Sequence, residues 1–218
     1  MDSSPLAPLA VDWRGRERYA LTWAHQLELH AKRRDGAIPD TLVLVEHEPV
    51  ITLGRQGELA NLLLSEERLT QLGIDFHRVE RGGDITYHGP GQLVGYPIWN
   101  LRERGISVRD LMRGLEEALI RVLARYGIQA GRIEGLTGVW VDGEKAAALG
   151  VAVKSGISYH GFAFNVEPNL EHFKLIVPCG ITDKPVTSMA RLLGRSVELD
   201  EVRAHAEREL RAVFGFAG

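Results

Sequence analysis

The chain is short of cysteine and of long apolar runs. Its 218 residues include one cysteine, Cys179, so no internal disulfide can form. No stretch approaches the roughly eighteen consecutive apolar residues that span a bilayer as a helix. The first residues also lack a basic segment followed by an apolar core, the pattern of a secretory signal. These absences predict a soluble protein of a reducing compartment, the cytoplasm, with no membrane partner.

An excess of charge of one sign is absent as well. The formal net charge is -3, which gives no electrostatic reason to expect a nucleic-acid partner. Hydrophobic residues make up 44% of the chain, enough to bury a core, and the length is near the upper size for one domain. We therefore expect a single domain over residues 1–218.

Common motifs for nucleotides and metals are missing. The chain has no G-x-G-x-x-G pattern, no P-loop and no H-E-x-x-H. His88, His160 and Cys179 do not have the spacing of a zinc site. We expect no metal ion and no cofactor.

Glycine is concentrated in one segment, residues 81–97, which reads RGGDITYHGPGQLVGYP and contains five glycines. Glycine allows tight turns and close approach of the backbone to a ligand. The glycines bracket a short strand at 85–87, and two such loops can direct N–H groups toward a carbonyl oxygen or an anion. A pair of β-turns is the simpler interpretation of the glycines alone. Arg81 and His88 in the same segment favour a ligand site.

Hydrophobic periodicity predicts an α/β protein. Short apolar strands are expected at 41–46, 50–53, 74–79, 85–87, 92–99, 137–141, 145–153 and 157–166. Helices are expected at 13–33, at 65–72, from Ser107 onward, and near the C-terminus, where Asp200 is the expected cap. Ser107 to Asp110 resembles a capping box, and the helix that follows is expected to bury Leu111, Leu115, Leu119, Val122 and Leu123. The strands 137–141 and 145–153 are expected to form a hairpin with a turn at Asp142-Gly143. The first helix would bury the apolar stripe Tyr19, Trp23, Leu27 and Ala31. Because the strands are grouped by hairpins and do not alternate strictly with helices, we expect a mixed, largely antiparallel sheet flanked by helices, of the α+β type.

Three residues are candidates for chemistry. Cys179 lies between a proline and a glycine, and a nucleophilic thiol needs a base or a cation to keep it as thiolate, although a lone cysteine is more often inert. Lys145 begins an apolar strand and can be that cation, or it can be a solvated strand end. His160 opens HGFAFN, in which small and large residues alternate like the wall of a slim apolar pocket, or it is a histidine of the core.

Together these segments resemble the lipoyl(octanoyl) transferases, which transfer octanoyl groups from acyl carrier protein to protein lysines. The resemblance is carried by EHEPV with TLGR at 46–55, the segment 81–97, TGVWV at 137–141, Lys145 with LGV at 149–151, HGFAFN at 160–165 and PCGI at 178–181. It implies that Cys179 forms the acyl thioester and that Lys145 lowers the pKa of the thiol. Three further residues, Ala146, Ala147 and Phe164, differ from the family's usual choices and are expected to reshape the acyl pocket.

The resemblance also implies the substrate-binding residues. These are Arg81, Gly82, Gly83, Asp84, Ile85, Thr86, Tyr87, His88, Ala148, Leu149, Gly150, His160, Gly161, Phe162 and Ala163. We expect the acyl chain to lie along Tyr87, Leu149 and Phe162. Backbone N–H groups at Gly82 and Gly83, or at Gly150, are expected to form the oxyanion site.

The implied fold is that of the biotin protein ligase and lipoate ligase catalytic domains. The implied donor is octanoyl-acyl carrier protein, and the implied acceptors are lipoyl domains of 2-oxoacid dehydrogenase complexes and the glycine cleavage H protein. One alternative is an ATP-dependent lipoate or biotin ligase, which needs no cysteine nucleophile. A Ser-Gly-Gly-Gly loop would favour that class, whereas RGG and HGPG favour the transferase. The other alternative is a non-enzymatic module that binds acyl groups or carrier proteins.

Overall fold

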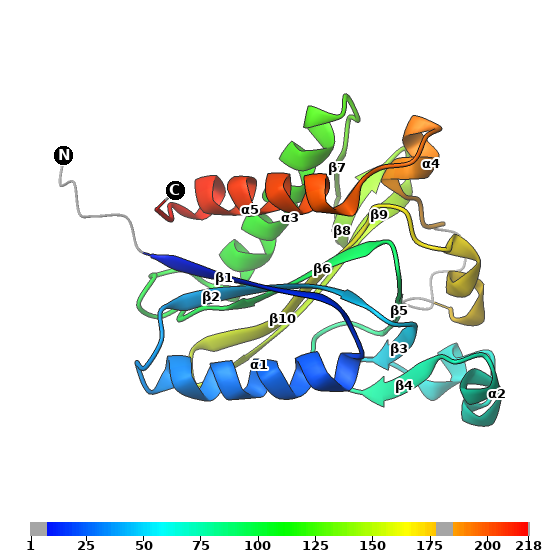
Figure 1. The fold of residues 1–218 in the computed structure, drawn as a ribbon, viewed down its shortest axis with the longest axis horizontal. Coiled ribbons are helices and arrows are strands. Elements are labelled where there is room, and N and C mark those ends of the chain that lie inside the picture. The colour runs from blue at the N-terminus through cyan, green and yellow to red at the C-terminus, as the bar shows by residue number, and fades with distance from the viewer. Residues whose placement is uncertain (1–7, 178–184, 218) are drawn as a thin grey trace.

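The computed structural model describes residues 8–177 and 185–217, and its centre is a seven-stranded sheet with helices on both faces (Figure 1). In spatial order the strands are β1 (Leu9–Glu17), β2 (Asp40–His47), β6 (Gln92–Ile98), β10 (Ile157–Asn165), β9 (Glu144–Lys154), β8 (Leu136–Val141) and β7 (Gly131–Ile133). The pair β1 and β2 is parallel, and the remaining neighbours among these strands are antiparallel. This confirms the predicted mixed, largely antiparallel sheet.

A second sheet of three strands lies at one end of the first (Figure 1). Its order is β4 (Asp75–Arg78), β3 (Val50–Leu53) and β5 (Ile85–His88). The 3₁₀ helices η1 (Leu59–Asn61) and η2 (Leu170–Leu175) and the helix α2 (Glu66–Gln71) accompany it. Helix α2 begins as predicted, because the Ser65 side chain accepts a hydrogen bond from the Arg68 amide. The small sheet presents β5 and its glycine-rich flanks to the large sheet.

Helix α1 (Tyr19–Arg34) covers one face of the large sheet, and α3 (Val108–Arg125) and α5 (Leu199–Phe214) cover the other (Figure 1). The short helix α4 (Met189–Leu193) precedes α5. A capping box between Ser107 and Asp110 starts α3, whose predicted apolar positions are all buried. A Cβ at Gly114 would lie 2.3 Å from the Phe214 ring, so the close crossing of α3 and α5 requires glycine there. None of the helices in the described ranges is long and apolar enough to cross a bilayer.

The first predicted helix is wrong in its start and in its buried face. Residues 13–17 belong to β1, and the helix begins at Tyr19. Leu27 is 46% exposed, and the buried side chains of α1 are Tyr19, Thr22, Gln26, His30 and Arg33. Four of these five are polar, because α1 faces polar groups of the sheet. The predicted cap of α5 is also wrong: Glu198 precedes the helix, with no side-chain cap.

The core divides into three apolar clusters. The largest lies between the large sheet and helices α3 and α5, the second under α1, and the third in the small sheet. Ala146, Ala147 and Phe164 are fully buried in the first cluster. Phe164 is opposite Ala147 across β9 and β10, so the large ring fills the volume that the small side chain leaves. These three residues are part of the core and do not line the cavity described below, contrary to expectation.

Candidate active site

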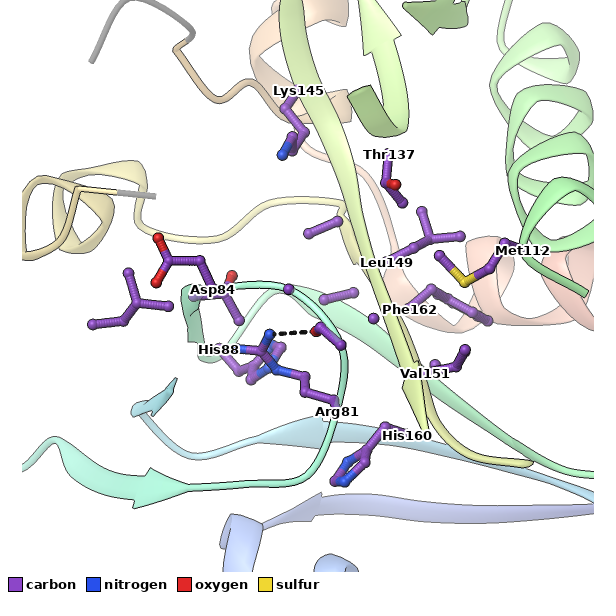
Figure 2. Close-up of a pocket in the computed structure, with 18 of the residues that line it drawn as sticks. Arg81, Asp84, His88, Met112, Thr137, Lys145, Leu149, Val151, His160 and Phe162 are labelled. Carbon is purple, nitrogen blue, oxygen red and sulfur yellow. Dashed lines mark hydrogen bonds between the residues drawn. The ribbon is translucent and has the colours of Figure 1, made fainter. Parts of the chain in front are cut away.

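A cavity of about 510 Å³ opens where β9 and β10 meet β5 and the loop before it. All the predicted substrate-binding residues except Tyr87 line it, and so does Lys145. Figure 2 shows Lys145 and His160 at opposite ends, with Leu149, Val151 and Phe162 between them. The structure therefore gathers three segments that are far apart in the sequence around one elongated, largely apolar space.

Tyr87 lies beneath the cavity. Its side chain is 1% exposed, its ring is 5.4 Å from that of Phe173, and its hydroxyl hydrogen-bonds to Nδ1 of His172 at 2.7 Å. Burial raises the pKa of Tyr87 to about 12. A Cβ at Gly89 would lie 1.9 Å from this hydroxyl, which explains one glycine of the motif. The side chain of Tyr87 therefore does not line the cavity, whereas Leu149 and Phe162, the other residues expected along the acyl chain, do.

Arg81 forms part of the cavity wall and is 8% exposed. Its guanidinium donates to the carbonyl oxygen of Thr52 at 2.7 Å, to Oγ1 of Thr52 at 2.9 Å and to the carbonyl oxygen of Gly82 at 3.1 Å. Thr52 belongs to β3, so the small sheet fixes the side chain. A Cβ at Gly54 would lie 2.4 Å from the carbonyl oxygen of Gly83 and 2.8 Å from the Arg81 guanidinium, and these close approaches explain the glycine of the TLGR motif.

The positive charge of Arg81 and burial keep the nearby histidines neutral. Burial, followed by the charges of Arg81 and Arg55, lowers the pKa of His160 to about 3. Burial is also the main cause that holds the pKa of His88 well below its usual range, and His47 and Arg81 add to it. The inner part of the cavity therefore carries neutral imidazole rings at physiological pH.

Two of the amides expected to form an oxyanion site, those of Gly82 and Gly83, are engaged within the protein, and Gly150 stays a candidate. The Gly82 amide donates to the carbonyl oxygen of Val151 at 2.9 Å, and the Gly83 amide donates to Oε1 of Gln56 at 2.7 Å. The first bond ties the glycine loop to β9 and thereby joins the two sheets. The Gly83 amide can reach a substrate oxygen only when the Gln56 side chain moves away, and Gly82 is unsuited to the role.

A chain of buried polar side chains crosses the site. Nδ1 of His88 is 3.2 Å from Oε1 of Gln92, whose amide donates to Oδ1 of Asn165 at 3.0 Å. Asn165 in turn donates to the carbonyl oxygen of Thr187 at 2.9 Å. Sequence reasoning did not select Gln92 or Asn165, although both are polar residues at the ends of apolar strands. It also missed Tyr19 and Tyr96, which line the cavity.

Lys145 is held at the outer end of the cavity. Its amide donates to the carbonyl oxygen of Pro185 at 2.9 Å, and its carbonyl oxygen accepts from the Thr187 amide at 3.0 Å. The ammonium lies 4.8 Å from the centroid of the Trp140 ring, a cation–π contact. The half-buried side chain is thus not a fully solvated strand end. Cys179, its predicted partner, lies outside the described residues.

Comparisons with known proteins identify the family of the chain. The lipoyl protein ligase A/B catalytic domain matches residues 18–211. An octanoyltransferase of Solibacter usitatus is 51% identical over 202 residues, which cover 93% of this chain and 91% of the relative. An octanoyltransferase of Alkaliphilus metalliredigens is 49% identical, with 93% of each chain covered.

Solved structures share the fold at low sequence identity. A bi-partite lipoate protein ligase from Thermoplasma acidophilum has a TM-score of 0.73 at 17% identity, covering 98% of this chain and 86% of its own. The biotin protein ligase from Aquifex aeolicus has a TM-score of 0.52 at 11% identity, covering 95% and 69%. The fold is therefore that of the lipoate and biotin protein ligases. With its sequence relatives, the chain belongs to the octanoyltransferases of the lipoyl protein ligase A/B family, and it is an acyltransferase.

Proposed function

We propose that the enzyme transfers an octanoyl group from octanoyl-acyl carrier protein to a lysine of a lipoyl domain, through a thioester on Cys179. The acceptors would be the lipoyl domains of 2-oxoacid dehydrogenase complexes and the glycine cleavage H protein, and residues 1–218 would form one catalytic domain. The observation that carries the proposal is the placement of the Lys145 cation at one end of an apolar cavity walled by the 81–88 and 160–163 segments.

In the first half-reaction, the Cys179 thiolate attacks the carbonyl carbon of the donor thioester. A new C–S bond forms at Cys179, and the C–S bond to the carrier breaks. The departing thiolate of the carrier takes a proton from the Lys145 ammonium. Because one thioester replaces another, the acyl group stays activated and no nucleotide is consumed.

In the second half-reaction, the neutral amine of the acceptor lysine attacks the acyl-enzyme. The amide C–N bond forms, the C–S bond to Cys179 breaks, and the proton lost by the amine goes to the neutral Lys145 side chain. Lys145 thereby returns to the ammonium form and Cys179 to the thiolate. Both residues are ready for another cycle.

The cavity suits a chain of octanoyl length. Residues 148–151 all line it, and they span about 10 Å at roughly 3.3 Å per residue of strand. An extended octanoyl group measures about 9 Å, given C–C bonds of about 1.5 Å. Burying it at about 0.8 kcal/mol per methylene supplies about 5 kcal/mol of binding free energy. Leu149, Val151 and Phe162 provide the apolar contacts.

The test is octanoylation of a purified lipoyl domain by octanoyl-carrier protein, without ATP or magnesium. We expect transfer by the wild type and none by Cys179→Ser. Incubation with the donor alone, followed by acid quenching and peptide mapping, should place one octanoyl group on Cys179. If free octanoate with ATP and magnesium supports transfer and Cys179→Ser keeps full activity, the enzyme is a ligase and the thioester mechanism fails.

A further inference from the structure

His160 has a backbone conformation that is unusual for its place in a strand. Apart from glycine, three residues in the described ranges have positive φ, and two of them, Asp142 and Ser155, lie in the turns on either side of β9. His160 lies inside β10 with φ 55°. Side chains other than glycine adopt this region only where the surroundings enforce it, and such residues gather at functional sites.

The positive φ of His160 coincides with a break in the hydrogen-bond ladder between β10 and β6. Their register is the same on both sides of the break, with Phe162 opposite Gly95 and Ile157 opposite Asn100. This register places His160 opposite Pro97, which has no N–H to donate. The strands also approach closely here, since a Cβ at Gly161 would lie 2.1 Å from the carbonyl oxygen of Gly95.

Helix α1 supplies the acceptor for the His160 amide. The missing N–H of Pro97 leaves the His160 carbonyl oxygen without a donor from β6, and the carbonyl oxygen of Pro97 already accepts from the Ser158 hydroxyl at 2.7 Å. The His160 amide donates to Oε1 of Gln26 at 2.9 Å, and Gln26 is fully buried. A side chain of a helix thus replaces a strand in the hydrogen bonding of β10. Without this acceptor the buried amide would be unsatisfied in its present conformation.

The positive φ changes the direction of the His160 ring. Alternation along β10 would place it with Phe162 and Phe164, which belong to the cluster under α3 and α5. Instead, its Nδ1 is 3.5 Å from the hydroxyl of Tyr19 on α1, and its ring is 4.9 Å from that of Tyr159 in the cluster under α1. The ring lines the cavity at the end opposite Lys145 (Figure 2). Its Nε2 makes no hydrogen bond, and the Glu80 carboxylate lies 3.7 Å from it.

We propose that Gln26 is a positioning residue that holds the His160 ring across the inner end of the acyl cavity, through the His160 amide, and thereby limits the length of the acyl chain. This inference rests on the proposed function. A methylene beyond octanoyl would have to displace or cover a polar ring whose Nε2 makes no hydrogen bond and has the Glu80 carboxylate 3.7 Å away. Without Gln26, β10 can return to extended backbone, and the ring leaves the path of the chain.

The experiment compares kcat/KM for octanoyl-carrier protein and decanoyl-carrier protein. In Gln26→Ala we expect the ratio of decanoyl to octanoyl to rise at least tenfold, because each newly buried methylene contributes about fourfold and the two together about fifteenfold. Gln26→Glu retains an oxygen acceptor and should keep the wild-type ratio. His160→Gly tolerates positive φ and removes the ring, so it should raise the ratio as Gln26→Ala does.

Thr22→Val is the matched control. Thr22 is also fully buried on the inner face of α1, and its hydroxyl donates to Glu17 at 2.7 Å, away from His160. This variant should lose a similar amount of stability and keep the wild-type ratio. A ratio that stays unchanged in Gln26→Ala and His160→Gly, or that rises equally in Thr22→Val, would overturn the inference. If Gln26→Ala does not fold, Gln26→Met takes its place, because it removes the acceptor and keeps most of the buried volume.

A second readout separates this inference from the proposed function. Thermal-shift titration with free octanoate and decanoate measures the length of the cavity without turnover. If the wild type transfers no acyl group, the proposed function fails, and the preference of the variants for decanoate still tests the role of Gln26. If the wild type transfers octanoyl groups and the variants show no preference for the longer chain in either assay, the inference alone fails.

Discussion

Mild acid should destabilise this protein more than most, because it buries several neutral histidines. His47, His88 and His160 are 0%, 6% and 1% exposed. Burial is the first cause in each case: it lowers the pKa of His47 to about 4 and of His160 to about 3, and holds that of His88 well below its usual range. In the unfolded chain these groups would titrate near about 6.5.

The sign follows from proton binding. Between pH 6.5 and 4 the unfolded chain binds protons at these positions and the folded chain does not, so the free energy of unfolding falls as the pH falls. In this window each histidine lowers the free energy of unfolding by about 1.4 kcal/mol for each pH unit of acidification. The three together lower it by about 4 kcal/mol for each pH unit. At pH 5.5 the loss is already about 4 kcal/mol, a large part of the roughly 5–15 kcal/mol by which domains are stable.

Urea unfolding at pH 7.5, 6.5, 5.5 and 5.0 measures this dependence. His47→Gln should reduce the slope by about a third, because one of three buried sites is removed. His205→Gln, at the surface of α5, is the control and should keep the wild-type slope. A free energy of unfolding that stays level from pH 7.5 to 5.5 would refute the reasoning, as would equal slopes in the wild type and His47→Gln.

Further predictions concern the proposed nucleophile Cys179, the packing of the sheet and a helix cap. Lys145→Met should raise the pKa of the Cys179 thiol and shift its iodoacetamide alkylation to higher pH, whereas Lys145→Arg keeps the cation; identical profiles would mean that the two side chains are not partners. Gly161→Ala places a Cβ 2.1 Å from a carbonyl oxygen of β6 and should cost about 1–3 kcal/mol or more, while Gly131→Ala meets open space; equal melting temperatures would contradict this. Ser107→Ala should lower the free energy of unfolding by about 1 kcal/mol and leave the transfer rate unchanged, and denaturation with the octanoylation assay checks both.

Local signals predicted the elements whose causes are local. Helix α3 followed from a capping box and an apolar stripe, and the hairpin of β8 and β9 from its Asp-Gly turn. The glycine-rich motif also led to the cavity, because close backbone approaches require glycine wherever they occur. Gly91 shows this directly, since a Cβ there would lie 2.2 Å from the carbonyl oxygen of Glu167.

Features that depend on distant partners could not be predicted. Strand β1 forms its hydrogen bonds with β2, and no pattern within residues 9–17 predicts that pairing. The polar face of α1 contradicts an apolar stripe because its polar side chains bond to strands of the sheet, and two of the partners, His160 and Lys154, lie more than a hundred residues away. Tyr87 was expected to line the cavity and does not, for a related reason. The alternation of side chains along a strand tells which residues share a face, but the surrounding fold decides which face meets the cavity.

In hydrogen-exchange experiments, the exchange rate of the His160 amide should follow the opening of helix α1 rather than the separation of strands. Amides within a regular ladder exchange when neighbouring strands separate, whereas this proton is covered by a glutamine 134 residues earlier in the chain. It should therefore exchange with the opening rate of α1, ahead of its neighbours in β10. Transient lifting of a surface helix would then loosen the deepest wall of the pocket while the strands stay paired.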